Sequence, residues 1–161
     1  MEITDEMLNA IKIVSPAPNA VYKICGDVLE PVFVSPDIPA LTGMSDEEFQ
    51  AAAGADAMGL VIPEDVSRVV AAVRKCLAAE KAADVYYRIY HKERGFDWVH
   101  AKIRILGTRD GIPLLQVSYT NATMETDIYR KLLNRSAQAI YVCDCATFEI
   151  LYTNVTARKY S

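Results

Sequence analysis

The sequence lacks the features that would assign it to several specialised classes. It has no hydrophobic run approaching the roughly 20 residues of a membrane-spanning helix, and Met1–Val14 has neither the basic nor the apolar stretch of a signal peptide. The seven glycines are scattered and form no phosphate-binding loop. A net charge of −4 provides no basic face for duplex nucleic acid. We therefore expect a cytoplasmic protein with no membrane segment and no direct nucleic-acid contact.

Cysteine and histidine are also scarce, which restricts the metal and catalytic sites that the chain could build. Four cysteines in 161 residues do not indicate a disulfide scaffold, because a chain of this length can bury an adequate core. Cys143 and Cys145 share one face of an expected strand, but no CxxC motif or histidine pair supplies the further ligands of a metal site. We expect His91 to end an inward strand face and His100 to point outward, which supports no catalytic triad.

The first half of the chain has the apolar spacing of helices, interrupted by two short strands. Apolar residues at helical spacing predict a helix over residues 3–14, with Thr4 as its N-cap. The prolines within residues 15–19 end this helix. Two strands are predicted after it, over residues 20–25 and 31–35.

A group of helices follows these strands. Ser45 and Glu48 form a capping box at the start of a short helix whose apolar anchor is Phe49. Pro63 then opens a long helix that extends to about residue 81. Its apolar stripe consists of Val66, Val69, Val70, Val73, Cys76 and Leu77. The carboxylate pairs Glu47/Glu48 and Glu64/Asp65 stand at helix starts, where they are better explained by the helix dipole than by acid–base catalysis.

The apolar period changes to two after residue 81. Three strands are predicted over residues 84–92, 96–106 and 113–121, with turns at 93–95 and 110–111. Their odd-numbered residues are mainly apolar and are expected to face the helices. The order of elements predicts the α+β class, with a five-stranded antiparallel sheet and helices on one face.

The end of the sequence resembles its beginning. A second helix is expected over residues 123–134, followed by strand-like runs over 139–145 and 149–153. These runs compare with residues 21–25 and 33–38, so we expect a second copy of the first unit to begin near residue 137 and to be cut off at Ser161.

Five segments carry a resemblance to a known family. They are Pro31–Pro36, Leu41–Ser45, Val61–Asp65, the pair Tyr87–Ile89 with Phe96–Val99, and Thr120–Thr123. In this order and spacing they resemble a PAS domain, the small sensory module of signalling proteins. Ile62 stands where that family frequently has histidine. The resemblance covers about residues 20–123.

The expected domain organisation follows from these observations. Residues 1–19 form a flanking helix and linker, 20–123 a PAS-like sensor domain, 124–136 a linker helix, and 137–161 the truncated start of a second PAS-like domain. The resemblance implies a non-catalytic sensory or dimerisation module of a bacterial-type, multi-domain protein, such as a two-component system. The output, for example a histidine kinase or a diguanylate cyclase, would lie outside this chain.

A cavity between the concave face of the sheet and the helices is the candidate ligand site. Its expected lining consists of Phe33, Phe49, Leu60, Val73, Tyr87, Ile89, Ile103, Val117 and Tyr119. The cofactor is unknown. The Asn-Cys-Arg-Phe motif of flavin-binding relatives is absent, and residues 64–81 contain no histidine, so the resemblance favours neither flavin adduct chemistry nor helix-ligated haem.

The outer face of the sheet is rich in aromatic residues and arginine, which is typical of contact surfaces. We expect a homodimer formed through the N-terminal helix and this outer face, which includes Tyr86, Arg88, Tyr90 and Trp98. Two alternatives remain open at this point. One is a small cone-shaped α+β enzyme with an acid–base dyad of His91 and Tyr87 in an open cavity. The other is a protein-interaction scaffold without a ligand.

Overall fold

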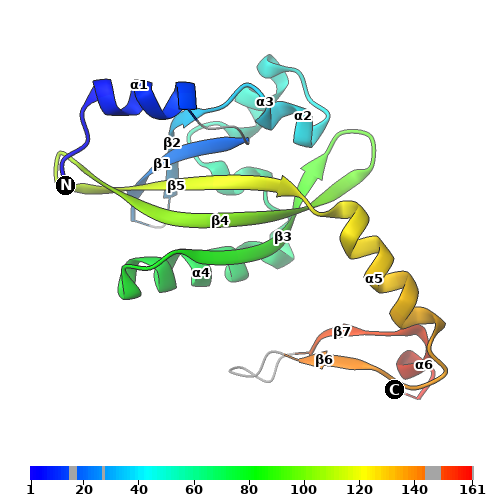
Figure 1. The fold of residues 1–161 in the computed structure, drawn as a ribbon. Coiled ribbons are helices and arrows are strands. Elements are labelled where there is room, and N and C mark those ends of the chain that lie inside the picture. The colour runs from blue at the N-terminus through cyan, green and yellow to red at the C-terminus, as the bar shows by residue number, and fades with distance from the viewer. Residues whose placement is uncertain (15–17, 27, 144–149, 161) are drawn as a thin grey trace. The chain divides into compact units, whose positions relative to one another are not determined.

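The computed structural model describes residues 1–14, 18–26, 28–143 and 150–160, which divide into two compact units, Met1–Ala122 and Thr123–Ser161 (Figure 1). The helices of the first unit are α1 Asp5–Val14, α2 Ile38–Thr42, α3 Asp46–Ala53, the 3-10 turns η1 Ala57–Leu60 and η2 Pro63–Asp65, and α4 Val66–Ala79. Its strands are β1 Asn19–Cys25, β2 Val28–Val34, β3 Ala83–His91, β4 Gly95–Arg109 and β5 Ile112–Asn121.

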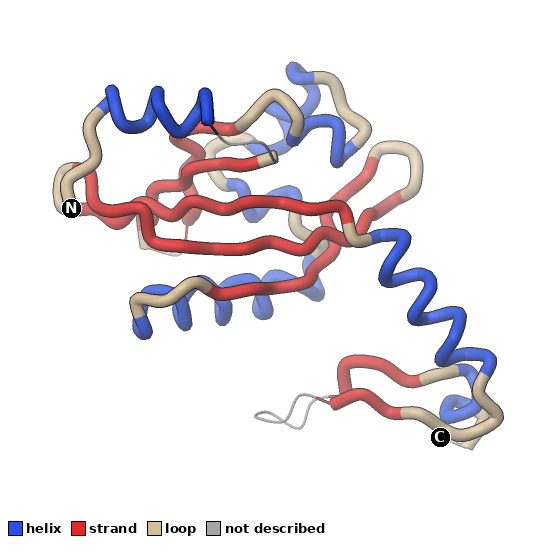
Figure 2. Tube along the Cα trace, viewed as in Figure 1, coloured by secondary structure: helices blue, strands red, loops and turns tan. Residues whose placement is uncertain are grey.

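The five strands form one antiparallel sheet in the order β2-β1-β5-β4-β3, which confirms the predicted fold class (Figure 2). The alternation that predicted the last three strands is clearest in β3, where every odd-numbered residue from Ala83 to His91 is buried. The long β3 and β4 pair over their whole common length, from Ala83↔Ile103 to His91↔Gly95. This regular pairing keeps one set of side chains directed at the helices.

Helices cover both faces of the sheet, as Figure 1 shows. The main core lies under α2, α3, η1 and α4, and includes Phe49, Val73 and Cys76 from the helices and Ile103 and Leu115 from the strands. The predicted capping box is present, with the Ser45 hydroxyl accepting from the Glu48 N–H and the Glu48 carboxylate accepting from the Ser45 N–H. A smaller core lies under α1 on the opposite face and contains Ile3 and Leu8.

Phe33 does not lie in the main core, so its expected place in the cavity lining is corrected. Phe33 pairs directly with Val21, and cross-strand partners share one face of a sheet. Val21 and Phe33 both pack in the smaller core under α1. The pairing register shifts between Val21 and Tyr22, because Tyr22 pairs with Pro31 and Val32 is the extra residue of a β-bulge. A uniform odd–even pattern does not anticipate such a shift.

β3 is an edge strand of the sheet, and the segment that leads into α4 covers its free edge. The Ile62 N–H donates to the Arg88 carbonyl at 3.0 Å, and the Arg88 N–H donates to Asp65 Oδ2 at 2.8 Å. The Arg88 guanidinium also binds the buried Asp65 carboxylate through two contacts of 2.9 Å. Asp65 therefore stands at the helix start as expected, but its side chain binds the sheet edge and makes no cap bond to its own helix.

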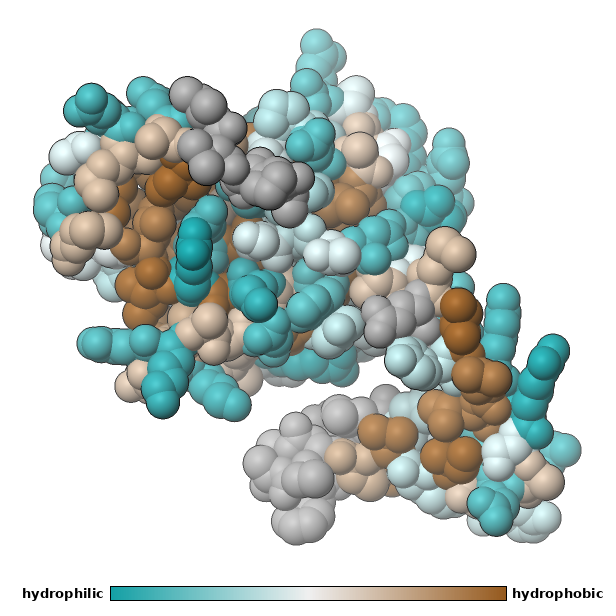
Figure 3. Space-filling view, viewed as in Figure 1, coloured by the Kyte–Doolittle hydropathy of each residue, from teal (hydrophilic) through white to brown (hydrophobic). Residues whose placement is uncertain are grey.

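The second unit consists of α5 Thr123–Arg135, the strands β6 Tyr141–Cys143 and β7 Ile150–Thr153, and α6 Val155–Arg158. Apolar side chains gather over α5, where Met124, Ile128 and Leu132 are exposed (Figure 3). Cys145, which was expected to share a strand face with Cys143, lies outside the described residues. Among the helices that the structure describes, none has the length and apolar character needed to cross a membrane.

Candidate functional site

Three small cavities adjoin one another in the first unit, and they are called outermost, middle and innermost here according to how exposed their lining residues are. The outermost has a volume of about 60 Å³ and is lined by Ile24, Gly26, Leu29, Met58, Val70, Val73, Arg74 and Leu77. The middle one, about 30 Å³, shares Leu29, Met58 and Val73 with it. The innermost, about 40 Å³, shares Tyr22, Tyr87 and Tyr119 with the middle one, among other residues. Neighbouring cavities are thus separated by shared side chains.

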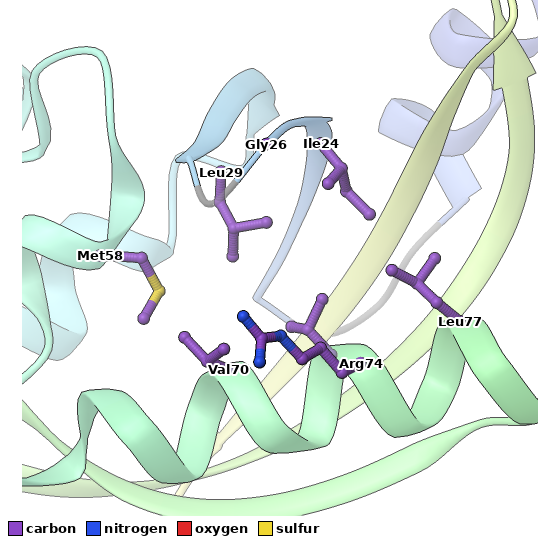
Figure 4. Close-up of a pocket in the computed structure, with 8 residues that line it drawn as sticks. Ile24, Gly26, Leu29, Met58, Val70, Arg74 and Leu77 are labelled. Carbon is purple, nitrogen blue, oxygen red and sulfur yellow. The ribbon is translucent and has the colours of Figure 1, made fainter.

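The outermost cavity opens between the β1–β2 hairpin and α4 (Figure 4). Leu29 and Met58 face Val70 and Arg74 of α4 across it. Met58 is a flexible side chain that adapts to irregular volumes, so the barrier toward the middle cavity is adjustable. Arg74 is the charged residue of this lining.

Three tyrosines from three strands meet at the two inner cavities. Tyr22 comes from β1, Tyr87 from β3 and Tyr119 from β5, and Tyr22 and Tyr87 are buried. The hydroxyls of Tyr22 and Tyr119 are hydrogen-bonded at 2.8 Å, and the Tyr87 hydroxyl also interacts with that of Tyr119. Tyr119 is therefore the centre of a hydroxyl chain, here called the tyrosine cluster.

The tyrosine cluster stays protonated at neutral pH. Burial raises the pKa of Tyr22 to about 12, although the hydrogen bond with Tyr119 acts in the opposite direction. Burial also raises the pKa values of Tyr87 and Tyr119, and the neighbouring tyrosines contribute to both shifts. Neutral phenols both donate and accept hydrogen bonds, so the cluster offers polar contacts without charge.

The structure brings together eight of the nine residues that the sequence placed in the lining. Phe49, Leu60 and Ile89 line the innermost cavity, Val73, Ile103 and Val117 line the middle one, and Tyr87 and Tyr119 line both. Only Phe33 lies elsewhere, for the reason given above. Tyr22, Leu29 and Met58 were missed. The sequence does contain a signal for Tyr22, because it is the aromatic residue of the strand predicted over residues 20–25.

His91 lies apart from the three cavities and forms part of the β3–β4 turn. Its Nδ1 accepts the N–H groups of Glu93 and Arg94, both at 3.2 Å. Its Nε2 lies 4.0 Å from the buried carboxylate of Asp97, which Arg94 also binds. None of these three linings includes His91, so none of the three cavities contains the His91–Tyr87 dyad.

The outer face of β3 and β4 carries exposed aromatic rings. Tyr86 is 44% and Tyr90 is 45% exposed. The Tyr86 ring stacks on His100 with 4.4 Å between centroids, and His100 Nε2 lies 2.9 Å from Asp84. His100 thus points outward as predicted. Arg88 is only partly exposed, because it extends around the strand edge to Asp65.

The described cavities do not fit the larger cofactors of sensory proteins. Sites for drug-sized ligands have volumes of roughly 300–1,000 Å³, whereas the largest of these three cavities has about 60 Å³. Their linings contain neither a cysteine for a flavin adduct nor a histidine for haem ligation. Among the described residues, no cluster of three or more histidines, cysteines or carboxylates is arranged to hold a metal ion.

Known proteins share this fold. The sequence matches the family described as the PAS fold over residues 31–119. A sensory box histidine kinase/response regulator from Burkholderia thailandensis E264 is similar in structure, with a TM-score of 0.56, 19% identity, and coverage of 78% of this chain and 91% of that chain. The LOV protein of Rhodobacter sphaeroides gives a TM-score of 0.61 and 13% identity, covering 82% of this chain and 76% of that chain. None of the curated protein sequences matches this one.

Proposed function

Because this chain belongs to the PAS fold family, we propose that residues 20–123 form a non-catalytic sensory module. The module binds a small neutral molecule beside the tyrosine cluster and passes the resulting change to α5. An output domain outside this chain would receive the signal. The observation that carries this proposal is the presence of three linked phenol groups bordering cavities in an otherwise apolar core.

The tyrosine cluster costs stability that phenylalanines would not cost. Burying a hydroxyl is unfavourable unless it is hydrogen-bonded, and each net hydrogen bond recovers only about 0.5–1.5 kcal/mol. Two contacts among three hydroxyls use two of the three protons. In the proposed complex the remaining proton would be donated to an acceptor of the ligand in the adjoining cavity.

The lining restricts the class of ligand. The innermost cavity has no charged side chain in its lining, and neither has the middle one. A charged molecule would therefore lose its hydration without gaining a counter-ion. A small, mostly apolar molecule with one hydrogen-bond acceptor, such as a ketone, matches these walls. Movement of Met58 and Leu29 would admit it from the outermost cavity.

A short path connects the tyrosine cluster with the end of the first unit. Tyr119 lies two residues before Asn121, the last residue of β5, and α5 begins at Thr123. The Ala122 N–H donates to the Trp98 carbonyl at 2.8 Å, which anchors this end of the strand to β4. A ligand that shifts Tyr119 would therefore change the strand from which α5 departs.

The proposal is tested by titrating the protein with cyclopentanone, a small neutral ketone, while NMR follows the tyrosine rings. We expect saturable shifts at Tyr87 and Tyr119 and at the amides of Ala122 and Thr123. Tyr119→Phe keeps the ring and removes the central hydroxyl, and it should weaken binding about tenfold, as expected for one hydrogen bond. Tyr86→Phe, which changes an exposed tyrosine on the opposite face, should bind as the wild type does.

Two outcomes would contradict the ligand role. One is linear, non-saturating shifts spread over the surface, which would mean that the cavities admit no ligand. The other is equal affinity in Tyr119→Phe, which would mean that the hydroxyl chain does not recognise the ketone. Native mass spectrometry of the purified protein provides an independent measurement, because a co-purified ligand would add its own mass.

A second role, pairing of two copies, is supported by the exposed rings on the outer face. We propose that a homodimer forms through α1 and the face carrying Tyr86 and Tyr90, since aromatic patches of this kind are enriched at interfaces. Light scattering should show a dimer whose fraction falls in Tyr90→Lys and stays unchanged in Tyr160→Lys, which alters an exposed tyrosine of the second unit. A monomeric wild type at all concentrations would contradict this role.

A further inference from the structure

The hairpin of the second unit has the same pairing scheme as the first hairpin of the first unit. The pairs are Ala20↔Val34, Val21↔Phe33 and Tyr22↔Pro31 in β1–β2, and Tyr141↔Thr153, Val142↔Tyr152 and Cys143↔Ile150 in β6–β7. In both hairpins the register shifts after the second pair. The extra residue is Val32 in one and Leu151 in the other, so each second strand has its β-bulge at the same place.

The two hairpins are also closed by the same pair of hydrogen bonds. In the first, the Ser35 N–H donates to the Asn19 carbonyl at 2.8 Å, and the Asn19 N–H donates to Ser35 Oγ at 3.0 Å. In the second, the Asn154 N–H donates to the Ile140 carbonyl at 3.1 Å, and the Ile140 N–H donates to Asn154 Oδ1 at 3.0 Å. A short helix follows in both cases, α2 and α6.

From this correspondence we infer that residues 140–143 and 150–158 belong to the opening segment of a second copy of the same fold, and that the edge of β6 is a docking site for an antiparallel strand. In the first unit the corresponding edge of β1 is occupied by β5, with Ala20 opposite Val117 and Tyr22 opposite Leu115. The occupant of the β6 edge is therefore an extended strand with apolar residues at every second position, as in β5.

The backbone directions agree with this assignment. Both polar backbone groups of Ile140 point toward Asn154, and successive residues of a strand direct these groups to opposite edges. Tyr141 therefore presents its N–H and C=O on the edge away from β7, as Ala20 does toward β5. Among the described residues β6 pairs only with β7, and Tyr141 and Val142 are 47% and 41% exposed. Such an edge is suited to strand addition.

The inference is tested on the full chain carrying a copy of Ile112–Asn121 after Ser161, joined by a flexible glycine–serine linker of about 15 residues. Tethering raises the effective concentration of the strand to the millimolar range. Hydrogen exchange measured by NMR should slow about tenfold or more at the Tyr141 amide. The Val142 amide faces β7 and should keep its rate, which makes it an internal reference. An appended copy with Val117→Pro, which loses the N–H expected to reach the Tyr141 carbonyl, should give no slowing.

Unchanged exchange at Tyr141 would overturn the docking site, and so would equal slowing by the Val117→Pro copy. Slowing that occurs without the appended strand and increases with protein concentration would identify a second copy of this chain as the occupant, and would also overturn the inference. The measurement does not depend on the cavities, so a failure here is distinguishable from a failure of the proposed ligand role.

Discussion

The contact between Asp65 and Arg88 leads to a quantitative prediction for the substitution Asp65→Asn. The Asp65 side chain is 2% exposed and accepts three hydrogen bonds from Arg88, one from the backbone N–H and two from the guanidinium. Asparagine has nearly the same shape, but it turns one acceptor oxygen into a donor that faces other donors. The substitution also leaves the guanidinium without its buried counter-ion.

The expected loss is about 2–3 kcal/mol in the free energy of unfolding. Breaking a buried ion pair by removing one partner typically costs about 3–5 kcal/mol. The Arg88 side chain is 25% exposed, so water restores part of its solvation and the expected loss lies at or just below the lower end of that range. Asp84→Asn is the matched control, because Asp84 is 51% exposed and its contact with His100 is a surface pair, for which about 0–1 kcal/mol is typical.

The loss should depend on pH in a defined direction. Burial alone would raise the pKa of Asp65, but the hydrogen bonds and charge of Arg88 outweigh it and hold this pKa below its ordinary value. A carboxylate with a lowered folded-state pKa stabilises the fold above its unfolded pKa of about 3.9 and loses that contribution as pH falls through the folded value. The difference between wild type and Asp65→Asn should therefore be full at neutral pH and shrink in acid.

Urea unfolding followed by the fluorescence of Trp98, the one tryptophan of the chain, reports on the first unit and measures this difference. A loss below about 0.5 kcal/mol at neutral pH would refute the reasoning, since that is the size of an ordinary surface effect. So would a difference that stays constant from neutral pH to well below the unfolded pKa, because the charged pair would then not be its source.

Two further predictions concern a tight contact and the buried phenols. In thermal unfolding, Gly43→Ala should destabilise the first unit more than Gly54→Ala does. Both glycines have positive φ, so the backbone strain of the substitution is common to both. A Cβ at Gly43 would lie 2.7 Å from His91 Cε1, whereas a Cβ at Gly54 would meet nothing within 4 Å. In an alkaline titration monitored by ultraviolet absorbance, Tyr22 should ionise near pH 12 and Tyr87 should resist ionisation further. Ionisation of all tyrosines in one step, before the fold is lost, would contradict the buried hydroxyl chain.

The local features of the fold could be predicted from the sequence because each depends on neighbouring residues. The alternation in β3 and β4 follows from the two faces of a strand, and it placed Ile103 inward and His100 outward, as the structure has them. The capping box of Ser45 and Glu48 is likewise complete within four residues. Eight cavity-lining residues were found by these rules.

The remaining features depend on contacts between distant residues. Phe33 was placed on the wrong face because the bulge at Val32 is set by pairing with β1 and leaves no local pattern. Asp65 stands at a helix start as predicted, but the partner of its side chain, Arg88, stands 23 positions later and could not be anticipated. The closing bonds of Asn154 were missed for a similar reason, because Ile140 stands 14 positions before it.

The division of aromatic residues between the two faces of the sheet has a practical consequence. Trp98 lies on the outer face, with the Arg88 guanidinium 5.8 Å from its ring, while Tyr22 and Tyr87 lie on the inner face beneath the helices. Tyrosines stand on the outer face as well, as Tyr86 and Tyr90 do, so the tyrosine signal mixes both sides of the sheet. The signal of the single tryptophan belongs to one side, so the unlabelled protein carries an optical reporter for a partner that binds to the outer face.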